Sequence, residues 1–311
     1  MSIEYAIIVK NKTRLESLIE RFNTKSQAKF YIESLGGSFD DYESEHEVFQ
    51  SSLISLQTQL SKVVKNKTVE RVYLPSFIFS DKNLIVVIGQ DGLVANTAKY
   101  SKSCPIVAVN PDKGRYDGIL LPFDTSDFIS GVENVIRNKF QFTTRRFAEA
   151  KLNDGQKLLA FNDLFIGASS HISARYKISF NDKTEEHSSS GLIVSTSAGS
   201  TGWLSSIFNM AYGVTSMFEK NLKPKRPKLK DNELLFAVRE PFQSIRTQTG
   251  ITAGVINQTH LIIESLMPTN GIIFSDGIET DFLKFNSGSI ATIGIAKETA
   301  KIVTNDMQNA T

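Results

Sequence analysis

The chain has 311 residues, of which 41% are apolar and 22% are charged, and its formal net charge at neutral pH is +2. This length suits two domains of ordinary size, and the composition is that of a globular protein, which excludes the disordered and fibrous classes. So small a net charge gives no reason to expect a nucleic acid or an anionic membrane as a partner.

No segment predicts export or insertion into a membrane. Residues 1–5 lack the basic and then apolar pattern of a secretory signal, and no apolar run is long enough to span a bilayer. The single cysteine, Cys104, has no partner for an internal disulfide, and its place at the start of an apolar run indicates a buried structural thiol. We therefore expect a cytoplasmic protein.

The first half of the chain alternates strand-like and helix-like segments. Thr13, with Glu16 three residues later, has the spacing of a capping box at the start of a helix. Further helices are expected from about residue 42 to 64 and from 126 to 138. Apolar runs lie at residues 5–9, 84–88, 106–109 and 118–121. Short continuous runs of this kind between helices predict a parallel sheet covered on both faces.

After about residue 145 the pattern changes to short, closely spaced apolar segments separated by turn residues. These segments lie at residues 158–161, 176–180, 192–194, 234–238, 261–263 and 272–274. Their spacing favours a mostly antiparallel sheet structure. We therefore predict an α/β domain over residues 1–145, a β-rich domain over 146–285, and a C-terminal segment, 286–311, that could return to the first domain.

One run of positive charge, Lys220–Lys230, contains two prolines and predicts an extended loop. A solvated surface loop and a contact with phosphate or nucleic acid both remain open for this run. It lacks the regularly spaced aromatic residues that would stack on bases.

The segment after the predicted strand at 84–88 is the first with candidate chemistry. It has the sequence Gly-Gln-Asp-Gly at residues 89–92, and a helical pattern follows at once. Ligands of parallel sheets bind beyond the carboxyl ends of the strands, where glycines let backbone N–H groups approach phosphate. A carboxylate there would repel phosphate, so Asp91 is expected to accept a proton or a hydroxyl hydrogen bond, or to hold a metal ion. A plain turn with Asp91 as a helix N-cap remains the alternative.

Two segments of the second half could line a ligand. Residues 195–203 follow an apolar strand and are rich in glycine and small hydroxyl residues, which suits a ribose or a phosphate. A hydroxyl-capped helix start would explain them equally well. The polar pair Asn162–Asp163 interrupts an apolar strand, and burial without partners would lower stability. A ligand could supply those partners, and a bulge or an exposed edge would serve as well.

Together, and in this order, these segments resemble the motifs of the NAD kinase family. The Gly-Gly-Asp-Gly turn of that family stands here as residues 89–92, and its Asn-Glu pair stands as 162–163. Its Thr-Pro-Thr-Gly-Ser-Thr-Ala-Tyr segment stands as residues 196–203, and its late Asp-Gly turn is similar to residues 274–277. The sequences at 12–14, 109–112 and 189–192 are most similar to the mitochondrial-type branch and its bacterial relatives.

The resemblance implies an N-terminal α/β domain with a parallel sheet and a β-rich, mostly antiparallel C-terminal domain, with the active site between them. It implies an enzyme that transfers a phosphoryl group from ATP to the adenosine 2′-hydroxyl of NAD and makes NADP. Mg²⁺ would bridge the donor phosphates. The implied partners are small-molecule nucleotides and further copies of the chain, in a homodimer or a higher homo-oligomer, with neither nucleic acid nor membrane.

The resemblance also assigns roles to individual residues. Asp91 would be the general base that draws the proton from the 2′-hydroxyl, and Gly89 and Gly92 would line the phosphates. The NAD-binding residues would be Asn162, Asp163, Thr196, Ser200 and Thr201. Lys12 and Arg14 would contact the donor phosphates. No residue of the chain is assigned as a metal ligand.

Departures from the family pattern leave two other functions open. Gln90 stands at the second glycine of the turn, and Leu93 stands at the threonine that follows it. Ser197-Ala198 replaces Pro-Thr, and Ser190 stands where many members have aspartate. These changes fit a non-catalytic protein that senses NAD(H) or another nucleotide, or a related kinase that acts on a sugar or lipid hydroxyl. The phosphoryl donor and the choice between NAD and NADH also stay open.

Overall fold

The computed structural model describes residues 3–219 and 227–305. The chain divides into two compact units, with residues 1–144 and 300–311 in unit 1 and residues 145–299 in unit 2. Two long strands, β6 (Phe142–Leu152) and β17 (Ile290–Val303), each begin in one unit and end in the other. Most of the lysine-rich run, residues 220–226, and the last six residues lie outside the described part of the chain.

Unit 1 is built on a parallel sheet. Its strands are β1 (Tyr5–Lys10), β2 (Lys65–Glu70), β3 (Asn83–Ile88), β4 (Pro105–Asn110) and β5 (Phe123–Asp124). They pair in the order β2-β1-β3-β4-β5, and residues 301–302 of β17 also pair with β4 in parallel. Every residue of β3 and β4 is buried, which explains why these segments are continuous apolar runs in the sequence.

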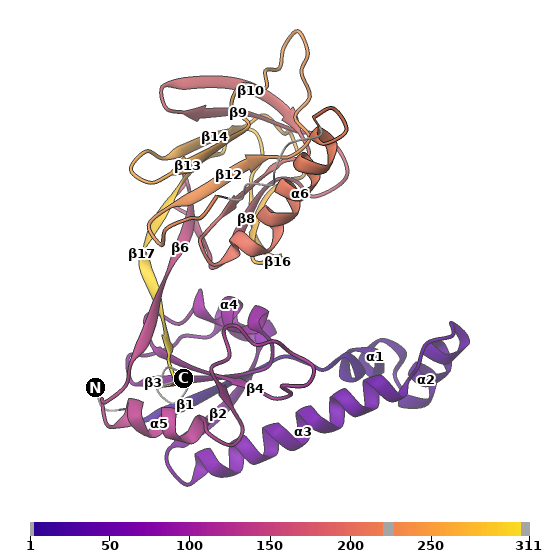
Figure 1. The fold of residues 1–311 in the computed structure, drawn as a ribbon, viewed down its shortest axis with the longest axis vertical. Helices are drawn as coiled ribbons and strands as arrows, with labels where there is room; N and C mark the ends of the chain where they lie inside the picture. Colours follow the sequence, from indigo (N-terminus) through magenta and orange to yellow (C-terminus); the bar gives the residue numbers. More distant parts are fainter. Residues whose placement is uncertain (1–2, 220–226, 306–311) are drawn as a thin grey trace. The chain divides into compact units, whose positions relative to one another are not determined.

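α3 (Asp40–Ser61) and α5 (Phe128–Ile136) cover one face of this sheet and α4 (Asp91–Ala98) covers the other (Figure 1). Unit 1 also contains α1 (Arg14–Phe22), α2 (Lys25–Ser34) and the 3-10 turn η1 (Arg71–Ser76). Phe49 of α3 and Val132 of α5 share one apolar cluster with the sheet, whereas α4 lies on the opposite face. α1 and α2 pack against the start of α3 around Leu15, Ala28 and Phe39.

The start of α1 has the predicted capping box. Glu16 N donates to Thr13 Oγ1 at 3.2 Å, and Thr13 N donates to Glu16 Oε2 at 2.7 Å. We expect Thr13→Ala to lower the free energy of unfolding by about 1 kcal/mol, because a helix N–H group loses its acceptor. Chemical denaturation measures the difference. Thr58→Ala is the matched control, since this exposed hydroxyl donates to Ile54 O within α3. Equal losses in the two variants would contradict the cap.

Unit 2 is a sandwich of two mostly antiparallel sheets. The first contains β10 (Lys183–Ser189), β9 (Ala174–Phe180), β14 (Leu261–Ser265), β17, β6 and β7 (Lys157–Ala160). The second contains β13 (Ala253–Ile256), β12 (Leu234–Val238), β11 (Leu192–Ser195), β8 (Asp163–Ala168), β15 (Gly271–Ser275) and β16 (Ile278–Lys284), in this order. Buried side chains of both sheets, such as Tyr176 and Phe236, form one shared core.

One helix covers the outer face of the second sheet. It is α6 (Trp203–Thr215), which follows the 3-10 turn η2 (Gly199–Thr201) and packs Leu204 against Phe165 and Ile193. Among residues 3–219 and 227–305, no helix is both long enough and apolar enough to cross a membrane.

The predicted fold class is confirmed: a parallel α/β unit is joined to a β-rich, mostly antiparallel unit. The strand expected at 118–121 is wrong. Gly118 has a left-handed φ of +67°, Leu121 N donates to Gly118 O at 3.0 Å, and Ile119 is 85% exposed. A left-handed residue breaks the extended conformation, so this apolar run forms a turn.

Candidate functional site

The Gly-Gln-Asp-Gly segment lies at the carboxyl end of β3, where unit 1 turns into α4. A Cβ on Gly89 would stand 2.9 Å from Leu93 Cδ2, so a side chain there would require Leu93 to shift. Gln90 is the N-cap of α4 and is exposed. Gly92 is also exposed, with nothing within 4 Å of the position of a Cβ. The turn therefore offers open backbone at a helix start, where a negative group is stabilised.

Asp91 is the first residue of α4 and not its N-cap. Its Oδ1 accepts a hydrogen bond of 2.6 Å from Leu120 N, in the turn that was expected to be a strand. The half-buried carboxylate thus ties the segment after β4 to the start of α4. This bond holds one oxygen of the carboxylate toward the segment after β4.

The Asn162–Asp163 pair and the hydroxyl-rich segment are brought together at one end of the second sheet of unit 2. Thr196 N donates to Asn162 O at 2.9 Å, and Thr196 Oγ1 donates to Phe161 O at 2.6 Å. A Cβ on Gly199 would stand 2.3 Å from Asn162 O, so only glycine fits this approach. The pair does not interrupt a strand: β7 ends at Ala160 and β8 begins at Asp163.

The three predicted hydroxyl residues differ in their surroundings. Thr196 is buried, and its hydroxyl is used within the chain. Ser200 Oγ donates to Ser197 O at 2.7 Å, and Thr201 is exposed in η2. Gly89, Asp91 and Gly92 thus lie together in unit 1, and the five predicted NAD-binding residues lie together in unit 2.

Asp276 holds the backbone of residues 161–163, a role that the sequence did not predict. Its Oδ1 accepts from Asn162 N at 2.6 Å and from Asp163 N at 3.2 Å, and its Oδ2 accepts from Phe161 N at 3.0 Å. Asp276 and Gly277 form the left-handed turn between β15 and β16, with φ values of +53° and +71°. An Asp-Gly pair between apolar runs signals a hairpin turn, but it does not reveal what the carboxylate binds.

We expect Asp276→Asn to lower the free energy of unfolding of unit 2 by about 1–3 kcal/mol. Asparagine tolerates the same backbone conformation. Its side chain has one acceptor oxygen where aspartate has two, so its NH2 group would face a backbone N–H group that loses its acceptor. Urea denaturation followed by the fluorescence of Trp203, the single tryptophan of the chain, reports on this unit. Asp182→Asn is the control, because Asp182 occupies the left-handed turn between β9 and β10. Equal stability of both variants would contradict the role of Asp276.

Asp163 places a buried polar atom at the same end of the sheet. Its Oδ1 is buried and has no hydrogen-bond partner in the described part of the chain. Burial raises the pKa of the Asp163 carboxyl to about 7; a contact with Ser195 opposes the rise, and the nearby charge of Asp276 adds to it. Near neutral pH this group can therefore donate or accept a hydrogen bond to a polar ligand atom.

A groove of about 940 Å³ opens on unit 2, and none of the eight predicted site residues lines it. Its wall contains stacked rings: Trp203 lies parallel to Phe165 at 5.7 Å, and Phe165 stacks on Phe274 at 4.9 Å. Arg239 lies over the ring of Trp203 at 5.4 Å, and Lys284 also lines the groove. Flat aromatic walls with cations nearby suit a ring-bearing, negatively charged ligand.

The two cations expected at the donor phosphates are both paired with carboxylates. Lys12 Nζ contacts Glu20 Oε2 at 2.8 Å. Arg14 forms an ion pair with Glu45 and lies over the ring of Tyr42 at 4.5 Å. Both side chains are thus drawn toward helices α1 and α3.

No family model matches the sequence, but part of the chain is similar to bacterial NAD kinases. It is 31% identical over 147 residues to the NAD kinase of Heliobacterium modesticaldum, covering 44% of this chain and 52% of that protein. It is 27% identical over 121 residues to the NAD kinase of Chlorobaculum tepidum, covering 38% and 42%. The matched region spans about half the length of these relatives.

The similarity of fold extends over nearly the whole chain. Yeast NADH kinase, solved in complex with NADH, matches 98% of this chain and 84% of its own, with a TM-score of 0.57 and 16% identity. An NAD kinase from Archaeoglobus fulgidus, solved in complex with ATP, matches 98% and 95%, with a TM-score of 0.56 and 15% identity. The chain therefore has the fold of these kinases and is related to NAD kinases in sequence. Similarity to the mitochondrial-type branch stays a prediction.

Proposed function

We propose that this chain is an NAD kinase, the kind of enzyme whose fold it has and whose bacterial members match part of its sequence. The observation that carries the proposal is Asp91, which lies at the carboxyl end of the parallel sheet with one oxygen fixed by Leu120 N. A carboxylate oriented in this way, beside open backbone at a helix start, suits removal of a proton from a hydroxyl next to phosphate.

In the proposed reaction, the adenosine 2′-oxygen of NAD attacks the γ-phosphorus of ATP. The bond between that phosphorus and the β–γ bridging oxygen breaks, and ADP leaves with the electron pair. Oδ2 of Asp91 takes the hydroxyl proton as the new O–P bond forms, while the Leu120 N–H holds Oδ1. The products are NADP, ADP and one proton. Gly89 and Gly92 give the phosphates access to the backbone, since positioning supplies much of the catalysis in phosphoryl transfer.

Mg²⁺ would neutralise charge on the donor phosphates when it is bound. Across residues 3–219 and 227–305, no three His, Cys, Asp or Glu side chains form a group that could hold a metal. Mg²⁺ in kinases commonly uses one or two carboxylates together with substrate phosphates. Because Asp91 is the proposed proton acceptor, the ion would be held by the substrate phosphates.

NAD itself would be bound by unit 2. Asn162 and Asp163 would hold a ribose or the adenine, and Asp163 supports this role because its buried Oδ1 has no hydrogen-bond partner among the described residues. Thr196, Ser200 and Thr201 would line the pocket, with Thr196 acting mainly through the segment that it holds. The groove beside Trp203 adds a surface suited to the rings and phosphates of a dinucleotide.

The test is an assay for NADP formation. The purified chain is mixed with NAD, ATP and Mg²⁺, and the product is measured with an NADP-specific dehydrogenase. Parallel reactions with NADH, and with polyphosphate in place of ATP, decide the acceptor and the donor. Product in any of these reactions supports a kinase of NAD(H). No product in all of them would overturn the proposal.

One observation favours a second candidate, a protein that senses NAD(H) or another nucleotide without turnover. Gln90 places an exposed side chain where the family has glycine, next to the backbone that should approach phosphate. This candidate predicts that NAD raises the melting temperature although no NADP forms.

A kinase that acts on a sugar or lipid hydroxyl is distinguished in another way. It would consume ATP only when the sugar or lipid is present.

Two further expectations accompany the proposed function. The chain is predicted to form a homodimer or a higher homo-oligomer, which light scattering after size-exclusion chromatography measures directly. It is predicted to act in the cytoplasm, which fractionation of cells tests.

A further inference from the structure

Lys10 is a mostly buried cation at the carboxyl edge of the unit 1 sheet. It is the last residue of β1, and its side chain is 14% exposed. Its Cα is paired with Glu70 at the end of β2 and with Ile88 at the end of β3. Because Ile88 directly precedes the Gly-Gln-Asp-Gly turn, Lys10 belongs to the edge at which ligands of parallel sheets bind.

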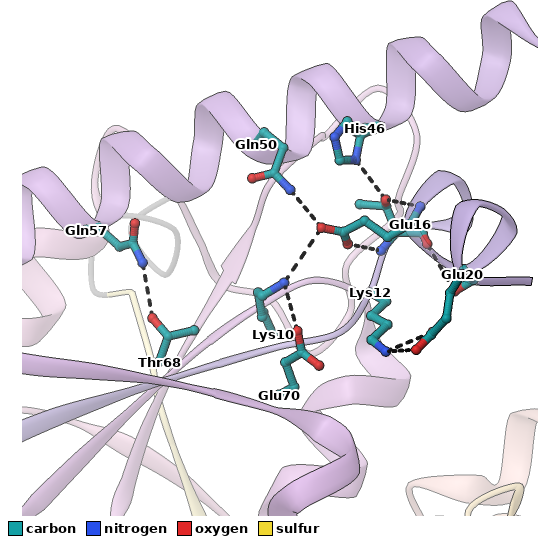
Figure 2. Close-up of polar contacts among 11 residues, drawn as sticks. Lys10, Lys12, Glu16, Glu20, His46, Gln50, Gln57, Thr68 and Glu70 are labelled. Carbon is teal, nitrogen blue, oxygen red and sulfur yellow. Dashed lines mark hydrogen bonds and ion pairs between the residues drawn. The ribbon is translucent and has the colours of Figure 1, made fainter. Parts of the chain in front are cut away.

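The ammonium of Lys10 is held between two carboxylates, but at long distances (Figure 2). Nζ lies 3.4 Å from Glu70 Oε1 and 3.9 Å from Glu16 Oε1. Close charge-assisted hydrogen bonds have lengths of about 2.7–2.9 Å. Glu16 is itself engaged elsewhere, since it accepts from Thr13 N at 2.7 Å and from Gln50 Nε2 at 3.1 Å. The two carboxylates therefore position Lys10 and leave its N–H groups available to a stronger acceptor.

Lys12 differs from Lys10 both in the length of its ion pair and in its exposure. It makes a close pair with Glu20 at 2.8 Å, as Figure 2 shows, and its side chain is 37% exposed. A second cation at the edge resembles Lys10: Arg71, which directly follows β2, has a buried Nε without a hydrogen-bond partner among residues 3–219 and 227–305. The edge thus has one cation with only long contacts, Lys10, and one with an unpartnered buried donor, Arg71.

We propose that Lys10 binds the phosphates of the phosphoryl donor, with Glu16 and Glu70 as the residues that position its ammonium. The proposal rests on the proposed function and names a donor contact that the motifs do not contain. Phosphate oxygens carry more negative charge per group than a carboxylate and are strong acceptors, so a triphosphate or polyphosphate would replace the two long contacts with short ones.

The first test is the effect of Lys10→Met on the donor. Methionine has a similar length but no charge. We expect the KM for ATP and the Kd of ATP, measured by calorimetry without NAD, to rise about tenfold or more, while the KM for NAD is unchanged. Lys10→Arg, which keeps the charge, should recover part of the affinity. Lys82→Met is the matched control, because this lysine lies before the first residue of β3 and is paired with Glu4, and it should leave both constants as in the wild type. An unchanged affinity for ATP in Lys10→Met would overturn the proposal.

A second measurement needs no variant and thus does not depend on folding of the substituted chain. The wild type is labelled with an amine-reactive reagent, and modification of each lysine is measured by mass spectrometry. ATP, or tripolyphosphate in a parallel reaction, should protect Lys10 and not Lys82. Equal labelling of Lys10 with and without either compound would contradict donor binding. Protection without NADP formation would retain the Lys10 contact and reject the kinase, so the two proposals fail separately.

Discussion

Replacing Asp91 with asparagine is expected to lower kcat for NADP formation by about 10²–10⁴-fold, because an amide cannot take the hydroxyl proton. Asparagine keeps an Oδ1 that can accept from Leu120 N, so the contact between the segment after β4 and α4 survives. The KM values for NAD and ATP should therefore change little. Steady-state kinetics with an NADP-specific dehydrogenase as the coupling enzyme gives all three constants.

Two other variants show whether the loss of turnover comes from the missing proton acceptor. Asp91→Ala removes the proton acceptor and the acceptor for Leu120 N, so it should match Asp91→Asn in turnover but fall below it in thermal stability. Asp112→Asn changes another carboxylate beyond a strand of the same sheet, one whose Oδ1 accepts from Gly114 N at 3.0 Å, and it should keep the turnover of the wild type. Full activity of Asp91→Asn would remove the role of general base.

The stability of unit 2 is expected to fall as the pH rises from about 4 to about 7, because of Asp163. Burial raises the pKa of this carboxyl from 3.8 to about 7 in the folded chain. Between these values the folded state binds a proton that the unfolded state does not, so a rise in pH favours unfolding. The full loss is about 4 kcal/mol, since one pKa unit corresponds to about 1.4 kcal/mol. This loss of stability is complete at pH values above the pKa that Asp163 has in the folded chain.

Asp163→Asn isolates this contribution, because it removes the titration and keeps the shape. Urea denaturation followed by Trp203 fluorescence at several pH values should show a smaller fall in stability for the variant than for the wild type. Other groups titrate in both proteins and cancel in the difference. Asp182→Asn, at an exposed turn, should have the pH dependence of the wild type. Parallel curves for the wild type and Asp163→Asn would show that the carboxyl is ionised throughout.

Much of the fold could be predicted because its determinants are local. The runs at 84–88 and 106–109 are apolar at every position or nearly so, as strands buried on both faces require. Thr13 and Glu16 have the spacing that a capping box fixes. The run at 118–121 has the same apolar character but contains Gly118 in a left-handed conformation, and periodicity alone does not distinguish such a turn from a strand.

The contacts of the site were harder to predict from the sequence, because they join distant segments. Asp276 binds the backbone of residues 161–163, and Asp91 binds the backbone at Leu120. A backbone N–H has no sequence signature, so neither pairing could be predicted. Lys12 and Lys10 are close in sequence, yet Lys12 is drawn to Glu20 of α1 while Lys10 ends a strand. The ion-pair partners of long charged side chains depend on where the helices lie, which the local sequence does not determine.

The path of β17 also bears on how the chain is made. Unit 1 is completed by residues that follow all of unit 2: Lys301 and Ile302 pair with β4, and Asn305 Nδ2 donates to Asp127 Oδ2 at 2.8 Å. The ribosome releases the N-terminal end of the chain first. Unit 1 is therefore the first unit to emerge and the last to obtain all of its residues. Until residues 301–302 are released, the start of β4 at Pro105 and Ile106 lacks this partner strand, and a nascent chain stalled within unit 2 would expose it.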